Sequence, residues 1–293
     1  MKYVIQHITE YRYGEPASLG HNEARLTPRT VPRQRCLSSW IMVEPMFTAW
    51  SEWDDYFGNR VSFFTIEQEH TALTVTARSE VELDEPHYPA PSETLAWDLV
   101  RDHLACPRTP ETIAAAQFLF DSPHIHQEAW LSDYARVSFP PRRPLLEATL
   151  DLTNRIYSEF QYSPASTDVS TPIREVFDSR RGVCQDFAHL QIACLRSLGL
   201  AARYVSGYLQ TDPPPGSPKL VGADASHAWL SVYCPGVGWL DVDPTNNHMP
   251  ALRHVTLAWG RDYSDVCPVK GVVLGGGQHL MRVSVDVSPV DDA

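Results

Sequence analysis

The chain has 293 residues, which by the usual size of about 150 residues per domain corresponds to two modest domains. Its 36 acidic residues outnumber 24 Lys and Arg, so the net charge of −12 repels polyphosphate and we expect no nucleic-acid partner. A hydrophobic fraction of 43% provides material for a core and excludes a disordered chain.

The N-terminus, Met1 to His7, lacks the apolar stretch of a signal peptide, and no segment approaches 18 consecutive apolar residues. We therefore expect a cytoplasmic protein with no membrane partner. Six cysteines are present without a C-x-x-C pair, so they are expected to remain thiols rather than disulfides or zinc ligands. The oligomeric state is left open.

Residues 1–85 have the composition of short β-strands separated by turn residues. A first strand is expected to run from Tyr3 to Tyr13 and to stop at Gly14. Three more are expected over Ser38–Val43, Asn59–Gln68 and Ala72–Leu83. These strands predict an antiparallel β-sandwich-like N-terminal domain or an open barrel.

A Pro-rich linker then leads into a helical connector, residues 86–144, with short helices expected over Glu93–His103 and Thr109–Phe120. A longer helix is predicted from Leu145 to Phe160. Its apolar spacing places four side chains on one stripe, namely Leu146, Leu150, Thr153 and Tyr157.

The following segment combines helices with antiparallel strands. A short helix over Ile173–Asp178 is expected to be capped by Thr171, and a second runs from Cys184 to Leu198 and stops at Gly199. Asp212–Gly216 is expected to be a loop. Strands follow over Ala202–Leu209, His227–Tyr233 and Gly238–Asp243. This order is typical of an α+β core, residues 145–260, and residues 261–293 read as a C-terminal β-hairpin over Lys270–Leu274 and Gln278–Val287.

Cys184 lies where a loop meets the start of a helix. Free backbone N–H groups and the helix dipole favour an anion there, so the reactive thiolate and a developing oxyanion are both stabilised. Most cysteines are packing residues, and Cys194, inside the apolar stripe of the same helix, is interpreted as one. The four others, Cys36, Cys106, Cys234 and Cys267, show no partner pattern.

His227 begins a strand, and Asp243 ends the next one. A hairpin between these strands brings the two side chains together, so that a carboxylate orients and stabilises the imidazole. Asp241 lies two residues before Asp243 and therefore points to the same face of the strand. The alternation of side chains along the strand leaves both residues as candidates for the orienting carboxylate.

Four segments also carry a resemblance: GVCQDFAHL at 182–190, AARYVSGY at 201–208, DASHAW at 224–229 and GWLDVDPTN at 238–246. They resemble the core of the bacterial transglutaminase-like superfamily, whose members are described as cysteine proteases. The segments Arg25–Arg29 and Asp54–Asn59 resemble the β-domain that precedes this core in bacterial members.

The resemblance implies a papain-like core of helices packed on an antiparallel sheet. It maps the nucleophile to Cys184, the base to His227 and the orienting carboxylate to Asp243, the Asp of the Asp-Pro-Thr signature. Tyr162 is the candidate side-chain donor to the oxyanion, and Gln185 and Trp229 are further candidate oxyanion or substrate contacts.

The implied reaction is acyl transfer through a thioester on a peptide or protein substrate, most simply hydrolysis of an amide, peptide or isopeptide bond. The alternatives are a transglutaminase or deamidase acting on glutamine side chains, or a non-catalytic peptide-binding module. No cofactor is expected. No calcium loop is present, and His124-Ile125-His126 has no helix-spaced partner, so no metal site is expected. Arg180-Arg181 is interpreted as a solvated loop, with steering of an acidic substrate as the alternative.

Overall fold

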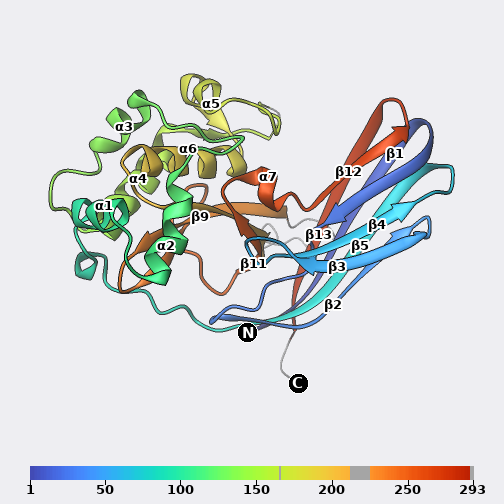
Figure 1. Ribbon diagram of the computed structural model, residues 1–293, viewed down its shortest axis with the longest axis horizontal. Helices are drawn as coiled ribbons and strands as arrows, with labels where there is room; N and C mark the ends of the chain where they lie inside the picture. Colours follow the sequence, from blue (N-terminus) through green and yellow to red (C-terminus); the bar gives the residue numbers. More distant parts are fainter. Residues whose placement is uncertain (165, 212–224, 291–293) are drawn as a thin grey trace, which may run out of the picture.

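The computed structural model describes residues 1–164, 166–211 and 225–290. A curled sheet forms one side of the molecule and a mixed helix and sheet core forms the other (Figure 1). The expected loop at Asp212–Gly216 lies outside the described residues.

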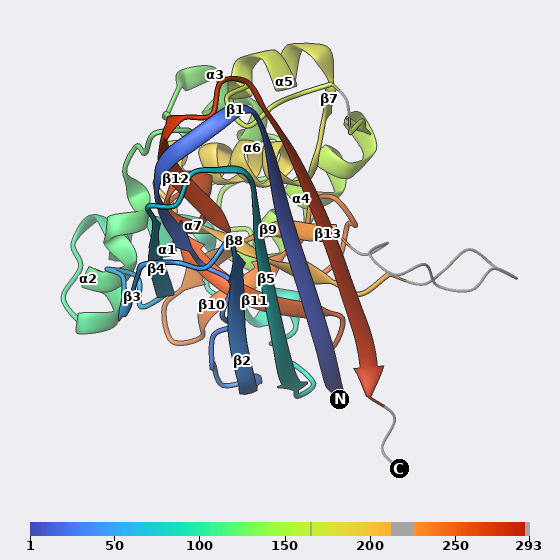
Figure 2. The same ribbon diagram turned by 90° about the vertical axis from the view of Figure 1, so that its right-hand side faces the viewer.

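Seven of the described strands, five from the N-terminal region and two from the C-terminal region, make one antiparallel sheet. Its strands are β1 (Lys2–Ala24), β2 (Gln34–Glu44), β3 (Ala49–Asp54), β4 (Arg60–Ile66), β5 (His70–Leu83), β12 (Val269–Gly275) and β13 (His279–Val290). The first half of β1 lies between β5 and β13, and its second half between β4 and β12. The predicted C-terminal hairpin is therefore part of the N-terminal sheet, as Figure 2 shows for β1, β5 and β13.

The prediction that the first strand stops at Gly14 is wrong. The Gly14 N–H donates to the Gln278 carbonyl at 2.7 Å, so the ladder with the C-terminal hairpin continues through the glycine. The register of β1 against β5 shifts between Arg12 and Ala17, where the long strand bends. A partner from the far end of the chain thus replaces the turn that the local sequence favours.

The core contains a second sheet in the order β10-β9-β8-β11. Its strands are β8 (Ala202–Leu209), β9 (Ala225–Cys234), β10 (Gly238–Val242) and β11 (His254–Gly260). The helices are α1 (Trp97–Ala105), α2 (Pro110–Ala116), α3 (Ala129–Arg136), α4 (Leu145–Glu159), α5 (Ile173–Ser179), α6 (Cys184–Ser197) and α7 (Tyr263–Val266), with short 3₁₀ turns η1 (Pro91–Glu93) and η2 (Gln117–Leu119). A small parallel pair joins β6 (Gln161–Tyr162) to β7 (Arg181–Gly182).

Helix α6 packs on β8 and β9, and its residues from Asp186 to Arg196 are all buried. A helix that is buried on all sides requires satisfied polar groups. Accordingly, Gln191 donates to Thr153 Oγ1 at 2.8 Å, and the Arg196 guanidinium donates to the Ala202 carbonyl at 2.9 Å. The helix that presents Cys184 is therefore fixed from every side.

One local prediction holds in part and another is wrong. Of the stripe predicted in α4, Leu146 and Thr153 are buried, but Tyr157 is 51% exposed, because the buried face is centred on Leu145, Leu152 and Ile156. At α5, Pro172 occupies the N-cap position without a side-chain cap, since the Thr171 hydroxyl accepts the Asp168 N–H at 2.9 Å instead.

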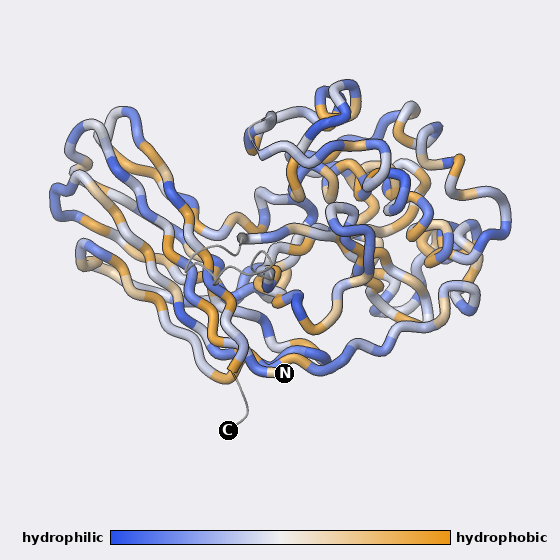
Figure 3. The backbone as a smooth tube through the Cα atoms, turned by 180° about the vertical axis from the view of Figure 1, so that it is seen from behind, coloured by the Kyte–Doolittle hydropathy of each residue, from blue (hydrophilic) through white to orange (hydrophobic). Residues whose placement is uncertain are grey.

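The curled sheet and the helix-and-sheet core share one hydrophobic cluster. Sheet residues such as Tyr3, Ile5 and Val285 belong to the same buried cluster as the side chains of α4 and α6. A second cluster, which includes Phe64 and Leu73, consists almost entirely of residues of the curled sheet. Figure 3 shows the matching alternation of hydrophilic and hydrophobic residues along the strands. The α+β class is confirmed, and the sandwich-like part consists of one curled sheet. None of the described helices is long and apolar enough to cross a membrane.

Candidate active site

Cys184 is the first residue of α6, and the start of this helix is held by its own third residue, Asp186. The Asp186 carboxylate accepts the Val183 N–H at 2.8 Å and the Thr167 hydroxyl at 2.7 Å. A Cβ on Gly182 would lie 2.9 Å from the Asp186 side chain, so glycine is required for this close approach. Asp186 thus fixes the loop-to-helix turn that presents the half-buried thiol.

His227 and Asp243 meet through the pairing of β9 with β10. Val242 lies opposite Leu230, which places Asp243 beside the start of β9. His227 Nε2 lies 2.7 Å from Asp243 Oδ2, and both side chains are buried. This contact leaves Nδ1 as the ring nitrogen available to Cys184, which lines the same cavity.

Asp241, the carboxylate that alternation leaves equivalent, has other partners. Its side chain accepts the Ser231 hydroxyl and forms an ion pair with Arg33 at 3.5 Å. The structure therefore brings Cys184, His227 and Asp243 into one array and leaves Asp241 outside it.

The electrostatics of the array favour a protonated imidazole. Burial by itself would lower the pKa of His227, but hydrogen bonds to Asp243 and Cys184 outweigh it and raise the pKa to about 10. Burial would raise the pKa of Asp243, and the donors around it, His227 first, hold that pKa below its ordinary value instead. A charged imidazole beside a sulfur atom stabilises the thiolate.

Two residues that the sequence analysis missed complete the surroundings of Asp243. Oδ2 accepts the Asn246 side-chain amide at 2.8 Å and lies 3.1 Å from His254 Nε2. Oδ1 accepts the backbone N–H groups of Thr245 and Asn246. Asn246 belongs to the Asp-Pro-Thr-Asn segment, so the motif could have identified it as a neighbour of Asp243. His254 lies in β11, and nothing in the sequence around it indicates a contact with Asp243.

The donor atoms of His227, Asp243 and His254 lie within 4.8 Å of one another, the spacing of a possible metal site. However, His227 Nε2 is only 2.7 Å from Asp243 Oδ2, closer than the roughly 3.3 Å that separates two ligands of a tetrahedral zinc ion with bonds of about 2.0 Å. The geometry is therefore that of a hydrogen-bonded array.

A cavity of about 240 Å³ lies over Cys184 and His227. One wall comes from the core, including Gln185 and Tyr204. The opposite wall comes from the curled sheet and consists of His7, Thr9 and Tyr11 of β1, Val269 of β12, and Met281 and Val283 of β13. The Tyr208 hydroxyl lies 3.0 Å from His7 Nδ1 and ties the two walls together. The site is thus built from both parts of the chain.

The other predicted contacts are placed differently. Gln185 lines the cavity, but Trp229 does not, because its ring is fully buried beneath His227 and His254. Tyr162 is 51% exposed and pairs with Gly182 across the short β6–β7 ladder. Its pKa is raised by burial and by Cys184, so it lies within electrostatic reach of the thiol.

Tyr204, which the sequence analysis treated only as part of a strand, is the buried tyrosine at the cavity. Burial and the neighbouring Cys184 raise its pKa well above the ordinary value. Its hydroxyl is therefore a second candidate hydrogen-bond donor near the thiol.

The remaining motifs of the sequence have structural explanations. His124 stacks on His189 with ring centroids 5.6 Å apart, and His126 pairs with Asp121 at 3.3 Å. Arg180 pairs with Glu159 at 3.3 Å and lies over the Phe177 ring.

The thiols differ enough to give a direct prediction. Cys184 and Cys36 are both half-buried, but only Cys184 has an imidazole partner, and burial raises the pKa of Cys36. At pH 6.5 we expect iodoacetamide to alkylate Cys184 at least about tenfold faster than Cys36, measured by peptide mass spectrometry over time. Buried Cys194, whose pKa is also raised by burial, should react last. Equal rates at Cys184 and Cys36 would contradict an activated thiol.

The fold and the site together define a papain-like α+β protein with a thiol at a helix N-terminus and a histidine and a carboxylate on neighbouring strands. Residues 124–244 match the transglutaminase-like superfamily, and residues 3–82 match the bacterial transglutaminase-like N-terminal region. The chain belongs to this transglutaminase-like superfamily.

Similar proteins are found in several bacteria. A Mycobacterium tuberculosis protein is 40% identical over 99% of this chain and 93% of its own length, and a Mycobacterium leprae protein is 32% identical over 97% of both. A segment is 32% identical to a protein-glutamine gamma-glutamyltransferase of Pseudomonas aeruginosa, over 41% of this chain and 18% of that one. A solved Cytophaga hutchinsonii structure, named as a proposed cysteine protease, has a TM-score of 0.76 at 22% identity and covers 100% of this chain and 92% of its own, which shows the shared fold.

Proposed function

We propose that the protein is a thiol-dependent acyl-transfer enzyme that hydrolyses an amide, peptide or isopeptide bond. The observation that carries the proposal is that buried His227 lies 2.7 Å from Asp243 and lines one cavity with Cys184, the first residue of α6. A nucleophile, a base and an orienting group in contact constitute the working unit of covalent acyl transfer.

In the first step the Cys184 thiolate attacks the substrate carbonyl carbon, and the carbonyl π electrons move to oxygen. Free N–H groups at the start of α6, with Tyr162 or Tyr204 as a side-chain donor, stabilise that oxyanion. The His227 imidazolium then donates its Nδ1 proton to the nitrogen of the leaving amine, the C–N bond breaks, and a thioester remains on Cys184.

In the second step a water molecule gives a proton to the now neutral His227 and its oxygen attacks the thioester. The C–S bond breaks, the acid is released, and the thiolate and imidazolium are restored. Asp243 stays ionised throughout and holds the ring in place. An amine in place of water gives transglutamination, and water acting on a glutamine thioester gives deamidation.

The size of the cavity indicates the kind of substrate. A volume of about 240 Å³ lies below the range of about 300–1,000 Å³ usual for drug-sized ligands. It accommodates one side chain or one extended peptide segment, and a folded domain cannot enter it. We propose an unstructured peptide, or a side chain on a protein surface, as the acyl donor.

Hydrolysis is favoured by the name of the Cytophaga hutchinsonii neighbour, a proposed cysteine protease, and amine transfer by the name of the Pseudomonas aeruginosa relative. The test is to incubate the protein with a mixed peptide library, with and without a primary amine, and to analyse the products by mass spectrometry. Cleaved peptides support hydrolysis, deamidated glutamines or amine adducts assign the alternatives, and enzyme alkylated at Cys184 is the control. A peptide-binding module would leave the library unchanged.

The wall formed by the curled sheet gives a prediction for specificity. Met281 lines the cavity, whereas Leu280, the preceding residue of β13, does not. Met281→Trp should lower kcat/KM for a peptide substrate at least about tenfold, because the larger ring narrows the acyl-binding space, and Leu280→Trp should change it less than about twofold. The small reagent iodoacetamide should alkylate Cys184 in both variants. Equal kcat/KM values for the two variants would contradict a substrate position against β13.

A further inference from the structure

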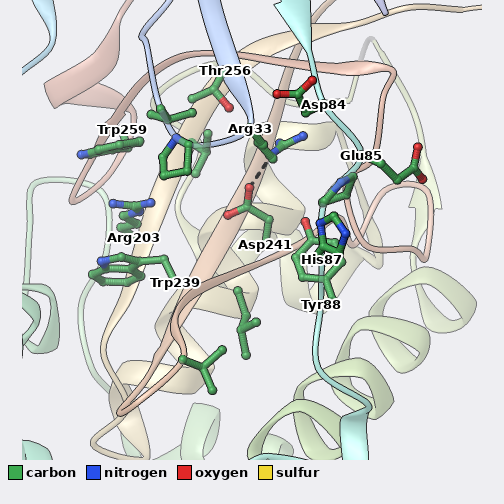
Figure 4. Close-up of a pocket in the computed structure, with 16 residues that line it drawn as sticks. Arg33, Asp84, Glu85, His87, Tyr88, Arg203, Trp239, Asp241, Thr256 and Trp259 are labelled. Carbon is green, nitrogen blue, oxygen red and sulfur yellow. Dashed lines mark ion pairs between the residues drawn. The ribbon is translucent and has the colours of Figure 1, made fainter.

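A second, larger cavity of about 960 Å³ lies between the curled sheet and the core (Figure 4). Its walls come from the loop between β1 and β2, from residues 84–88 after β5, and from β8, β10 and β11. It shares no lining residue with the cavity at Cys184. Its volume is that of a small-molecule binding site.

Arg203 of β8 forms the inner wall of this cavity. Its guanidinium lies between two indole rings, 4.3 Å from the centroid of Trp239 and 3.8 Å from that of Trp259, as Figure 4 shows. The side chain is only 9% exposed. Because the rings cover both faces of the guanidinium, only its edge is available for hydrogen bonds.

That edge lacks an acceptor. Nε donates to Ser231 Oγ at 3.3 Å, but Nη1 and Nη2 have no hydrogen-bond acceptor, and Arg203 has no ion-pair partner, in the described part of the chain. Burial lowers the pKa of Arg203, the charge of Asp241 partly offsets this, and Arg29 adds repulsion. Asp241 is already bound to Ser231 and Arg33.

A largely buried cation whose terminal N–H groups face a cavity and have no acceptor from the chain favours an anion in that cavity. A carboxylate has two oxygens that match two parallel N–H bonds of a guanidinium edge. The indoles of Trp239 and Trp259 on either side supply apolar contact for the atoms next to that carboxylate. At the outer rim, exposed Asp84 and Glu85 carry negative charge that suits an ammonium group.

We propose that this cavity binds a short peptide with free ends, its C-terminal carboxylate on Arg203 and its N-terminal ammonium at the Asp84–Glu85 rim. The cavity is separate from the thiol. Its proposed ligand, a peptide with free ends, belongs to the same chemical class as a peptide cleavage product. It does not depend on whether Cys184 performs catalysis.

The test uses the full-length Cys184→Ala protein, so that no peptide is consumed. The tripeptide Gly-Leu-Gly and its C-terminal amide are titrated by calorimetry, with tryptophan fluorescence as a second signal from Trp239 and Trp259. We expect the free acid to bind at least about tenfold more tightly than the amide, N-acetylation to weaken binding a few-fold, and Arg203→Lys to remove the preference for the acid. Equal affinity for acid and amide, or no saturable binding of the acid, overturns the proposal.

Location is checked with Met281→Trp, which narrows the cavity at Cys184 but does not touch this one. Unchanged binding of the acid in this variant supports the second site, and its loss shows that the peptide lies at the thiol and overturns the proposal. If Arg203→Lys does not fold, as judged by thermal unfolding, the acid and amide comparison in protein with Arg203 intact decides the question alone.

Discussion

Cys184→Ala should abolish product formation, with a fall in kcat on the order of 10⁶, as found when the nucleophile of a hydrolase triad is removed. The reason is that Cys184 is the only described thiol that lines the cavity at His227. The measurement is the initial rate of the reaction that the peptide library identifies, with purified variant and wild type at equal concentration.

The matched control is Cys36→Ala, which removes a half-buried thiol in β2, far from His227 in the chain and outside the active-site cavity. It should retain the wild-type rate. Because Cys184 lies at a helix start and is not fully buried, its loss should leave the thermal unfolding temperature close to that of wild type. Substantial activity in a folded Cys184→Ala protein would disprove the thioester mechanism.

Asp243→Asn should be the second most damaging change. It keeps the shape of the side chain but removes the charge that stabilises the imidazolium, and the equivalent change in a serine protease triad lowers kcat about 10⁴-fold. Here the effect is reinforced because Asp243 is fully buried and accepts hydrogen bonds from His227, His254 and Asn246. Asp241→Asn, which removes a carboxylate bound to Ser231 and Arg33, should lower the rate less than about tenfold.

The same variant should also change the pH dependence. The raised pKa of His227 means that the imidazolium is present at lower pH and is lost only as the pH rises through about 10. Without the Asp243 charge that pKa falls, so the imidazolium is lost at a lower pH. Because the imidazolium protonates the leaving amine, the alkaline limb of kcat/KM should begin near pH 10 in wild type and shift downward in Asp243→Asn. An unshifted limb would show that Asp243 does not control the charge of His227.

Part of this structure was accessible from local sequence pattern. The start of α6 and strands β8 to β10 follow from periodicity, and the motifs around Cys184, His227 and Asp243 identified three side chains that the fold brings together. These segments are predictable because each pattern coincides with the element that its own residues form.

The rest depends on contacts between distant residues. The continuation of β1 past Gly14 requires β12 and β13, which lie more than 240 residues away. The contact of His254 with Asp243 requires β11, and the cavity wall at His7 and Met281 requires both ends of the chain. No local propensity encodes such pairings, because they arise only when the whole chain packs.

The shared sheet also sets an order of events during protein synthesis. Chains are synthesised from the N-terminus, so Cys184, His227 and Asp243 are made before residues 279–290. Met281 and Val283, which line the cavity at the thiol, are translated after the core. A chain made only as far as the core therefore carries the three site residues without the β13 part of the cavity wall.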